Sequence, residues 1–563
     1  MAYKKNFAAW PPGRPHNIAP ATRTLFANLE HSYQECADKT ALVFYETEIS
    51  YRELYQSVLR MASWLHHEAG VNRGDRVAIF SQNCPQYVIA YYATLAAGAV
   101  VVPLNPMYVE EELTYLLDNS GARVLFAATE LGHAFVPVLE RREIRAVAIE
   151  YQDYLRVETS LPVPDFVKGI GSRSATELAQ QLPQLALWAD VVNESRVFER
   201  PPTSLDDLVM LPYTSGSTGN PKGCMHDHHS TQHALRGVYD WFGIGRDDVI
   251  LAVAPMFHVV GLQAGMNTAI ACGCTAIILP RWDRQVAAHA ICNYRVTVWP
   301  AVPTMIIDLI NMPDFSRYDI SSLRILFGGG STLPEAVAAQ LKELCGVAFM
   351  EGYGMTETCC PGTANPVHQP RPQCAGIPVF NTHVRIVDHD TLESMADGEV
   401  GEVLISGPQI LRGYWQDEVA NAESFVELDG RRYLRTGDLG YLDAEGYLYV
   451  VDRIKRMINA SGFKVWPTQV EAVLYRHPAI AEVCVIASQD PKRGETVKAL
   501  VVVSGAYPQL RAEDIIEWSR EHMAAYKIPR LIEFVPSLPK SGSGKVLWRQ
   551  LQEEEKRRIP QSA

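Results

Sequence analysis

Short apolar runs alternate with longer helical patterns along most of the 563-residue chain. The first clear set is a buried-strand pattern at Arg76–Phe80, an apolar helix pattern at Pro85–Gly98 and a second strand pattern at Ala99–Pro103. A strand, a helix and a further strand in this order form a βαβ unit, whose strands run parallel. Because the pattern recurs further on, it predicts an α/β fold of parallel sheets covered by helices. The less periodic segment 150–205 predicts surface excursions instead.

The pattern changes at Gly376, after which short alternating runs are separated by Gly and Asp as far as Tyr449. Such alternation predicts an antiparallel β unit, which we expect to be a barrel-like subdomain attached to the sheets. A dense charged segment, 452–456, then precedes a new α+β series. We therefore expect a large N-terminal domain at 1–451, a hinge at 452–456 and a small, mobile C-terminal domain at 457–563.

The stretch TSGSTGNPKG, Thr214–Gly223, follows an apolar run and predicts a strand that leads into a phosphate-binding loop. Glycines let backbone N–H groups converge on an anion, the hydroxyls add donors, and Lys222 supplies a positive charge. The Walker pattern does not apply, because Gly223 rather than Ser or Thr follows the lysine. The alternative is a solvated Ser/Gly linker with a turn at Asn220-Pro221.

Two further strand patterns run into glycine-rich loops, the first at Gly328–Gly330 and the second at Glu351–Glu357 (EGYGMTE). The carboxyl ends of neighbouring parallel strands form the ligand crevice of an open sheet, so we expect both loops to join the phosphate loop around one nucleotide. Tyr353 offers a flat ring, Thr356 a hydroxyl, and Glu357 an oxygen ligand for magnesium. Taken alone, YG-x-T-E is equally consistent with a simple turn.

Single residues elsewhere carry weaker signals. His258 lies in the apolar run PMFHVVG and is a candidate base, although a lone histidine there more often lines a pocket. Asp438 follows a strand pattern and could accept hydrogen bonds from a ribose diol; the alternative is an ordinary Asp turn. Lys545, in the Ser/Gly loop PKSGSGK, is either solvated or a cation that domain closure delivers to a reacting phosphate.

The metal-binding residue types do not form a clear site. His226, His229 and His233 could share one face of a predicted helix, but without a carboxylate partner set we favour a polar helix face over a metal site. Eleven cysteines are scattered without C-x-x-C pairs. We therefore expect neither a disulfide framework nor a structural metal.

Charge and hydropathy limit the class of partner. A formal net charge of −13 and a pI near 5.7 disfavour nucleic-acid binding, so phosphates must be held by local groups. The N-terminal stretch has no apolar signal region, and no window offers the run of about 18 apolar residues that a membrane span needs. We expect a cytoplasmic protein that acts on small molecules, with any membrane association peripheral.

Four signals, TSGSTGNPKG, EGYGMTE, YLRTGDLGYLDAEGYLYVVDR and PKSGSGK, have an order and spacing that resemble those of the adenylate-forming (ANL) superfamily. The resemblance extends from about residue 25 to about residue 555. It implies a large domain that binds ATP and a carboxylic acid, and a small domain that swings between two orientations. The stretches PMFHVVG, YATLAAGAVVVPLNPMY and RIKRMINASGFKVWPTQVEAVL are most similar to medium- to long-chain fatty acyl-CoA synthetases.

The resemblance also implies a role for each motif residue. The β- and γ-phosphates of ATP would be held by Thr214, Ser215, Gly216, Ser217, Thr218, Gly219 and Lys222. The adenine pocket would be formed by Gly328, Gly329, Gly330, Glu351, Gly352, Tyr353 and Gly354. The catalytic set would be Thr356 at the α-phosphate, Glu357 with Thr218 at Mg²⁺, His258, and Lys545 in the first half-reaction. The ribose would be bound by Asp438 and Arg453, while Lys455 would be the hinge residue and Gly462 would face the pantetheine of CoA.

These residue types suit the implied chemistry. A carboxylate attacks the α-phosphate in line and pyrophosphate leaves, so concentrated negative charge must be met by magnesium and lysine. The lysine must then withdraw so that a thiol can attack the acyl-AMP. The stretch PMFHVVG corresponds to the motif at the start of the acid pocket in this superfamily. It lacks the aspartate that would pair with the ammonium group of an amino acid, which favours an apolar acid as substrate. The implied function is the conversion of a medium- to long-chain fatty acid, ATP and CoA to acyl-CoA, AMP and pyrophosphate.

Several alternatives stay open. Within the class, the chain could be an aryl or branched-acid CoA ligase, or an enzyme that loads a carrier protein. The triple glycine at 328–330 and the Cys359-Cys360 pair depart from many relatives and leave the chain length open. From another class, a non-catalytic ligand-binding relative is disfavoured, because Lys222, Glu357 and Lys545 are all retained. Relatives that act on long chains are often dimers, so a homodimer is expected.

Overall fold

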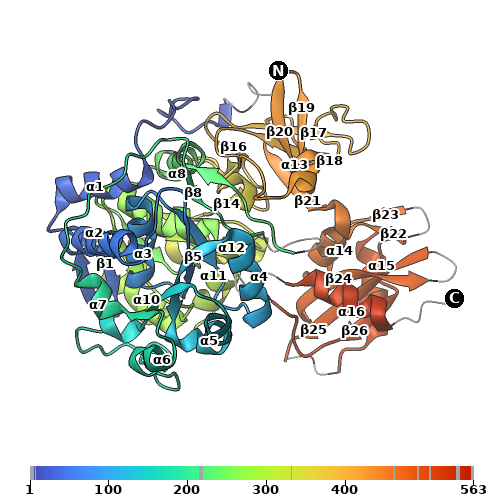
Figure 1. Cartoon of the computed structure of the whole chain (residues 1–563). Helices are drawn as coiled ribbons and strands as arrows, with labels where there is room; N and C mark the ends of the chain where they lie inside the picture. The colour runs from blue at the N-terminus through green and yellow to red at the C-terminus, as the bar shows by residue number, and fades with distance from the viewer. Residues whose placement is uncertain are drawn as a thin grey trace. The chain divides into compact units, whose positions relative to one another are not determined.

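The computed structural model describes residues 6, 8–214, 220–330, 332–460, 463–490, 494–505, 507, 509–540 and 546–558. The described chain forms two compact units (Figure 1). The sheet unit comprises Asn6–His383 and Ser406–Phe425. The C-terminal unit comprises Val384–Ile405 and the chain from Val426 onward. The segment 406–425 therefore returns to the sheet unit after the chain has entered the other one.

In the described part of the sheet unit, two mostly parallel sheets carry the βα pattern that the sequence predicts. One sheet has the strand order β7-β6-β5-β3-β4-β8-β9, with β9 antiparallel at its edge. Its strands are β3 (Arg76–Phe80), β4 (Val100–Leu104), β5 (Ala122–Ala128), β6 (Arg145–Ile149), β7 (Leu185–Leu187), β8 (Leu208–Met210) and β9 (His226–Asp227). The predicted segment of surface excursions, 150–205, thus supplies the edge strand β7 as well, because three apolar residues suffice to pair with β6.

The other sheet has the order β16-β15-β14-β13-β12-β10-β11-β1-β2 and is parallel from β14 to β1. Its strands are β1 (Thr40–Phe44), β2 (Thr47–Ser50), β10 (Val249–Ala252), β11 (Thr275–Ile278), β12 (Val298–Pro300), β13 (Ile325–Gly328), β14 (Phe349–Tyr353), β15 (Thr363–Ala364) and β16 (Ile377–Pro378). The glycine-rich loops after β13 and β14 are neighbours, since these two strands pair in parallel with Gly328 opposite Glu351.

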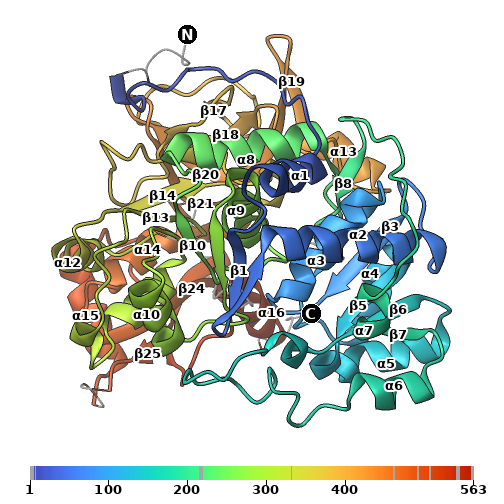
Figure 2. The ribbon, with the colours of Figure 1, turned by 90° about the vertical axis from the view of Figure 1, so that its left-hand side faces the viewer.

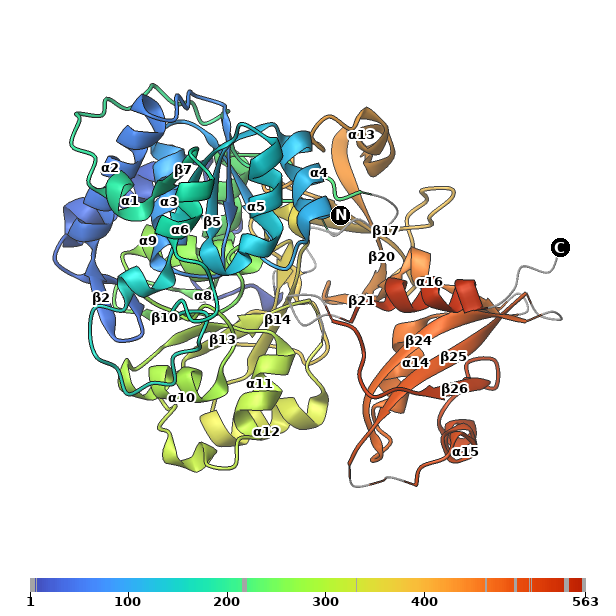
Figure 3. The same cartoon turned by 60° about the horizontal axis from the view of Figure 1, so that its bottom comes forward.

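Helices cover both sheets of this unit, and Figures 2 and 3 show α4, α5 and α6 beside β5 and β7. The helices are α1 (Leu25–Cys36), α2 (Tyr51–His67), α3 (Pro85–Ala96), α4 (Glu110–Ser120), α5 (Gly132–Arg141), α6 (Ala175–Gln181), α7 (Trp188–Val192), α8 (His228–Phe242), α9 (Thr268–Cys272), α10 (Arg284–Asn293), α11 (Pro303–Ile310), α12 (Glu335–Cys345) and α13 (Glu418–Ser424). Local signals set their ends: the Asp227 side chain caps α8, and Gly243 ends it in a left-handed conformation.

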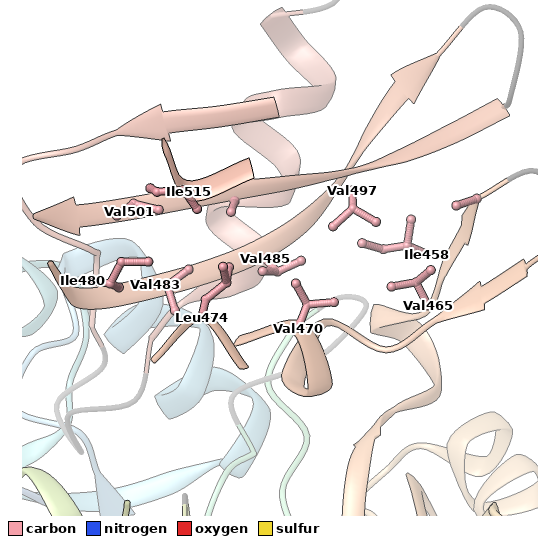
Figure 4. Packing of buried hydrophobic residues seen from close by; sticks show 12 residues of the cluster. Ile458, Val465, Val470, Leu474, Ile480, Val483, Val485, Val497, Val501 and Ile515 are labelled. Atoms are coloured by element: carbon pink, nitrogen blue, oxygen red, sulfur yellow. The ribbon is translucent and has the colours of Figure 1, made fainter. Parts of the chain in front are cut away.

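The C-terminal unit contains a sheet of order β17-β18-β20-β19, with β21 on β20, in which β20 pairs antiparallel with β18 and β21. A second sheet has the order β23-β22-β25-β24, with β26 on β25. Its elements are β17 (His383–Val387), β18 (Gly401–Ser406), β19 (Phe425–Leu428), β20 (Arg431–Leu442), β21 (Leu448–Arg453), β22 (Ile458–Ala460), β23 (Phe463–Val465), α14 (Pro467–Leu474), β24 (Ile480–Asp490), β25 (Gly494–Val503), α15 (Ala512–His522), β26 (Leu531–Phe534) and α16 (Trp548–Arg558). Figure 4 shows its core, in which Val470, Leu474 and Ile515 pack with Val483, Val485, Val497 and Val501.

The predicted fold class, helix-covered parallel sheets with a β subdomain and a smaller α+β C-terminal part, is confirmed. The domain boundaries and the hinge at 452–456 stay predictions. No helix in the described ranges is both long and apolar enough to cross a bilayer.

Candidate active site

The two described ends of the phosphate loop are held together by hydrogen bonds. The Thr214 amide donates to the Lys222 carbonyl at 2.9 Å, and the Lys222 amide donates to the Thr214 hydroxyl at 3.4 Å. These bonds hold Thr214 and Lys222 beside one another shortly after β8, and the predicted phosphate-binding role of the segment stays a prediction. Five predicted phosphate-binding residues, Ser215, Gly216, Ser217, Thr218 and Gly219, lie outside the described residues.

A segment far along the chain pairs with the strand that leaves this loop. The Trp415 amide donates to the Gly223 carbonyl at 2.8 Å, and Met225 exchanges backbone hydrogen bonds with Arg412 and Gly413, both at 2.9 Å. This pairing brings Asp417 to 3.7 Å from the Lys222 ammonium, which also lies 5.3 Å from the centre of the Tyr414 ring. No sequence motif marked Tyr414 or Asp417 as part of the site. The run GYW after a strand carries no phosphate-binding signal of its own.

The triple glycine after β13 is explained by close approach of backbones. A Cβ on Gly328 would lie 1.8 Å from the Ala301 carbonyl oxygen, and one on Gly329 would lie 2.5 Å from that of Gly352. Gly330 has a φ of +91°, which side-chain-bearing residues rarely adopt. Backbone from β12, β13 and β14 is thus brought together without intervening side chains. The adenine-binding role predicted for Gly328–Gly330 and Tyr353 stays a prediction.

The buried side chain of Glu351 links the neighbouring loops by hydrogen bonds. Its carboxylate accepts hydrogen bonds from the backbone N–H groups of Leu333 at 3.0 Å and Gln373 at 3.3 Å. Asn365 donates through its side chain to the Glu351 carbonyl at 3.0 Å and so anchors β14. Burial outweighs the two N–H donors and raises the pKa of Glu351 to about 7.

The raised pKa of Glu351 makes the stability of the wild-type protein depend on pH near neutrality. Because its folded pKa of about 7 lies above the usual glutamate value of 4.5, the folded state binds the proton more tightly than the unfolded chain does. The associated stability is present below about pH 4.5 and is lost as the pH rises through about 7. We expect Glu351→Gln to remove a loss of about 2.5 kcal/mol between pH 5 and 8. Thermal unfolding of both proteins across this range measures it; parallel curves would contradict the assignment.

Thr356 and Glu357 lie in a short 3-10 turn that follows β14, Thr356–Thr358. His226, in β9, forms a 2.8 Å hydrogen-bond contact from Nε2 to the Thr356 carbonyl. The Leu411 amide donates to the Glu357 carbonyl at 2.9 Å, and the Tyr414 hydroxyl donates to Glu357 Oε1 at 2.9 Å. The turn is therefore held by a residue that precedes it in the chain, His226, and by two residues that follow it, Leu411 and Tyr414.

The chemistry of Glu357 fits a magnesium ion shared with ATP. A carboxylate is a hard oxygen ligand, and Mg²⁺ in nucleotide sites is usually held by one or two carboxylates together with substrate phosphates. Across the described residues, no group of three or more His, Cys, Asp or Glu side chains is arranged to hold a metal ion. A magnesium ion at Glu357 would take phosphate oxygens of the nucleotide and water among its other ligands. Thr218, the other predicted metal-binding residue, lies outside the described residues.

The predicted polar face of the histidine-bearing helix is wrong, because most of these histidines are buried. Besides His226, the structure buries His228, whose Nδ1 accepts from the Leu25 amide at 3.1 Å, and His233, whose Nε2 contacts the Phe380 carbonyl at 2.9 Å. Burial lowers the pKa of each of these three histidines to about 4. They are neutral groups that position neighbouring backbone.

His258 lies in a turn after β10, where its amide donates to the Pro255 carbonyl at 3.1 Å and its ring packs against Phe257 with centroids 4.3 Å apart. The following glycine, Gly261, begins a π-helical segment, Gly261–Asn267, that is buried throughout. A Cβ added at Gly261 would lie 2.2 Å from the Pro255 carbonyl oxygen, so only glycine fits there. This setting suits a pocket wall, and a catalytic role for His258 stays a prediction.

The remaining predicted residues belong to the C-terminal unit. Arg453 Nε lies 2.9 Å from Asp438 Oδ1, and the two residues are opposite one another on β20 and β21. The predicted ribose-binding pair is thus brought together. Lys455 lies in a single turn, Ile454–Arg456. Gly462 and Lys545 lie outside the described residues.

The fold and these loops are those of a known family. Residues 29–415 match the model of the family described as AMP-binding enzyme, and residues 469–545 match that of the AMP-binding enzyme C-terminal domain. The chain belongs to this family of AMP-binding enzymes, which confirms the predicted adenylate-forming superfamily and the prediction of an AMP-forming acid–thiol ligase.

Individual relatives cover nearly the whole chain. It is 34% identical to a long-chain-fatty-acid–CoA ligase of Bacillus subtilis (strain 168) over 99% of both chains. It is also 34% identical to a feruloyl-CoA synthase of an Amycolatopsis species, over 89% of this chain and 93% of that one. Among solved structures, the anthranilate CoA ligase AuaEII in complex with anthranoyl-AMP aligns with a TM-score of 0.81 and 26% identity, over 95% and 98% of the two chains.

Proposed function

We propose that the chain activates a medium- to long-chain fatty acid with ATP, forming acyl-AMP and pyrophosphate, and then transfers the acyl group to CoA. The broader reaction class follows from the family. The acyl class is supported by the match with the Bacillus subtilis long-chain-fatty-acid–CoA ligase over nearly the full length of both chains. It is also supported by the pocket motif PMFHVVG, which contains no carboxylate for a substrate ammonium group.

One observation carries the proposal of phosphate chemistry. Lys222 of the phosphate loop and Glu357 of the turn after β14 both contact the side chain of Tyr414. The cation and the carboxylate to which we assign phosphate and metal binding therefore lie near one another in the sheet unit. A nucleotide triphosphate with its metal requires both charges close together.

The chain's own residues would then act in two stages. In the first, Lys222 holds the phosphates, the Thr356 hydroxyl donates to the α-phosphate, and Lys545 orients the acid carboxylate for in-line attack. Magnesium bound at Glu357 would neutralise phosphate charge. Asp438 and Arg453 take the ribose hydroxyls. In the second stage Lys545 withdraws by rotation at Lys455, and Gly462 faces the pantetheine whose thiol attacks the acyl-AMP.

The test is pyrophosphate release from ATP and magnesium across a panel of carboxylic acids, with and without CoA. The panel runs from acetate through octanoate and octadecanoate to benzoate and ferulate. A CoA-stimulated maximum at octanoate or longer acids is the expected result. A maximum at acetate, or phosphate release in place of pyrophosphate, would contradict the proposal.

An aryl acid is the second candidate substrate, because the feruloyl-CoA synthase matches with the same identity as the fatty-acid ligase. In the same panel this alternative predicts release with ferulate or benzoate and none with octadecanoate. Acyl-AMP that accumulates in the presence of CoA would instead indicate a carrier-protein acceptor.

A further inference from the structure

Tyr414 connects two predicted ATP-binding groups that come from distant parts of the chain. Its hydroxyl donates to Glu357 Oε1 at 2.9 Å, and the Lys222 ammonium lies 5.3 Å from the centre of its ring. The residue is buried, and its backbone pairs with Cys224, two residues after Lys222. Backbone pairing therefore fixes the position of Tyr414 independently of the contacts that its side chain makes.

The hydrogen bond to Glu357 has a definite consequence for the carboxylate. A phenol that donates to one oxygen of an ionised carboxylate restricts its rotation and stabilises its charge. The hydrogen bond to Oε1 therefore sets the orientation in which the Glu357 carboxylate would meet a cation. Partners of this kind, which orient a metal ligand without touching the metal, commonly change metal affinity by about 10- to 100-fold when removed.

The aromatic ring of Tyr414 acts on the second group, the Lys222 ammonium. A cation above an aromatic face is attracted by the ring, and Asp417, three residues further on, pairs with the same ammonium at 3.7 Å. The segment Arg412–Asp417 therefore constrains both Lys222 and Glu357. The hydroxyl acts on the carboxylate and the ring on the lysine, so the two effects are separable by mutation.

We propose that Tyr414 is a positioning residue that orients Glu357 for the metal ion of bound Mg·ATP. This inference rests on the proposed function, since it assumes that the nucleotide binds with magnesium at Glu357. It adds a residue from the segment 406–425, which no sequence motif marked. The hydroxyl is required for the metal-dependent part of nucleotide binding, whereas the metal-independent part depends on the loop.

The experiment is calorimetric titration of the full chain with ATP, without acid substrate, once in excess MgCl2 and once in EDTA. For Tyr414→Phe we expect the Kd for Mg·ATP to rise about tenfold or more. The Kd for metal-free ATP is expected to stay within about twofold, because the ring beside Lys222 is kept. Mn²⁺ binding followed by its paramagnetic resonance spectrum, in the presence of ATP, gives a second readout that does not use activity.

Two further variants make the test specific. Glu357→Gln should show the same magnesium-selective loss, and the double variant should lose little more than either single one, because the two side chains act as one unit. Tyr213→Phe is the matched control: it removes a hydroxyl that is bonded to Asn119 at 2.6 Å and does not contact Glu357. The control should bind Mg·ATP like the wild type.

Each outcome decides the inference. Unchanged Mg·ATP binding in Tyr414→Phe, or equal losses with and without magnesium, would overturn it while leaving the proposed function intact. A wild-type chain that binds no ATP would overturn the proposed function as well. Should the phenylalanine variant fail to fold, Tyr414→His supplies a ring with a donor, and its Mg·ATP affinity must then exceed that of Tyr414→Leu.

Discussion

Replacing Lys545 with alanine is expected to lower the rate of acyl-AMP formation by about a thousandfold, because the cation that orients the carboxylate and the α-phosphate is lost. Thioester formation from supplied acyl-AMP should be nearly unchanged, since attack by the thiol on the activated carbonyl does not use this lysine. The measurement compares pyrophosphate release from ATP and acid with acyl-CoA formation from synthetic acyl-AMP.

Lys540→Ala is the matched control for this experiment. Lys540 belongs to the same PKSGSGK motif but pairs with Glu482 at 2.9 Å within the C-terminal unit. It should retain both half-reactions. If Lys545→Ala kept adenylate formation, or lost both half-reactions equally, the role that the family resemblance implies for Lys545 would be wrong.

Gly328→Ala is expected to be the most destabilising single-methyl change among the glycines predicted to bind the nucleotide. The added Cβ would lie 1.8 Å from the Ala301 carbonyl oxygen and 3.3 Å from the Phe349 ring, so β12 and β13 would have to separate. Overpacking against backbone cannot be relieved by rotating a side chain, and we expect a loss of about 3 kcal/mol or more in the free energy of unfolding of the sheet unit. ATP affinity should fall with it.

Gly245→Ala provides the control, because a Cβ at Gly245 meets nothing within 4 Å. Its melting temperature should equal or slightly exceed that of the wild type, since alanine restricts the unfolded chain. Thermal unfolding and ATP titration of both variants measure the difference. Equal melting temperatures for Gly328→Ala and Gly245→Ala would show that β12 and β13 are not held as close as the structure places them.

Local sequence patterns predicted the sheets and the loops that follow them. The runs at Arg76–Phe80 and Ala99–Pro103 form paired parallel strands, and Gly328–Gly330 ends a strand beside β14. Such features depend on the periodicity of neighbouring residues and on the backbone freedom of glycine, which are both legible along the chain. The same patterns could not separate a solvated helix face from a buried one. The hydrogen-bond partners of His228 and His233, the Leu25 amide and the Phe380 carbonyl, come from residues far away in sequence.

The sequence by itself determined the class of this protein: four motifs, in order, identify an adenylate-forming enzyme without any coordinates. The tertiary structure alone decided how the site is held. Glu357 and Tyr414 are 57 residues apart, and Trp415 pairs with Gly223 because the segment 406–425 returns to the sheet unit. A motif identifies the groups that a reaction needs, because the chemistry fixes their residue types. The partners that orient those groups can come from any part of the chain that the fold brings close, so no fixed spacing in the sequence predicts them.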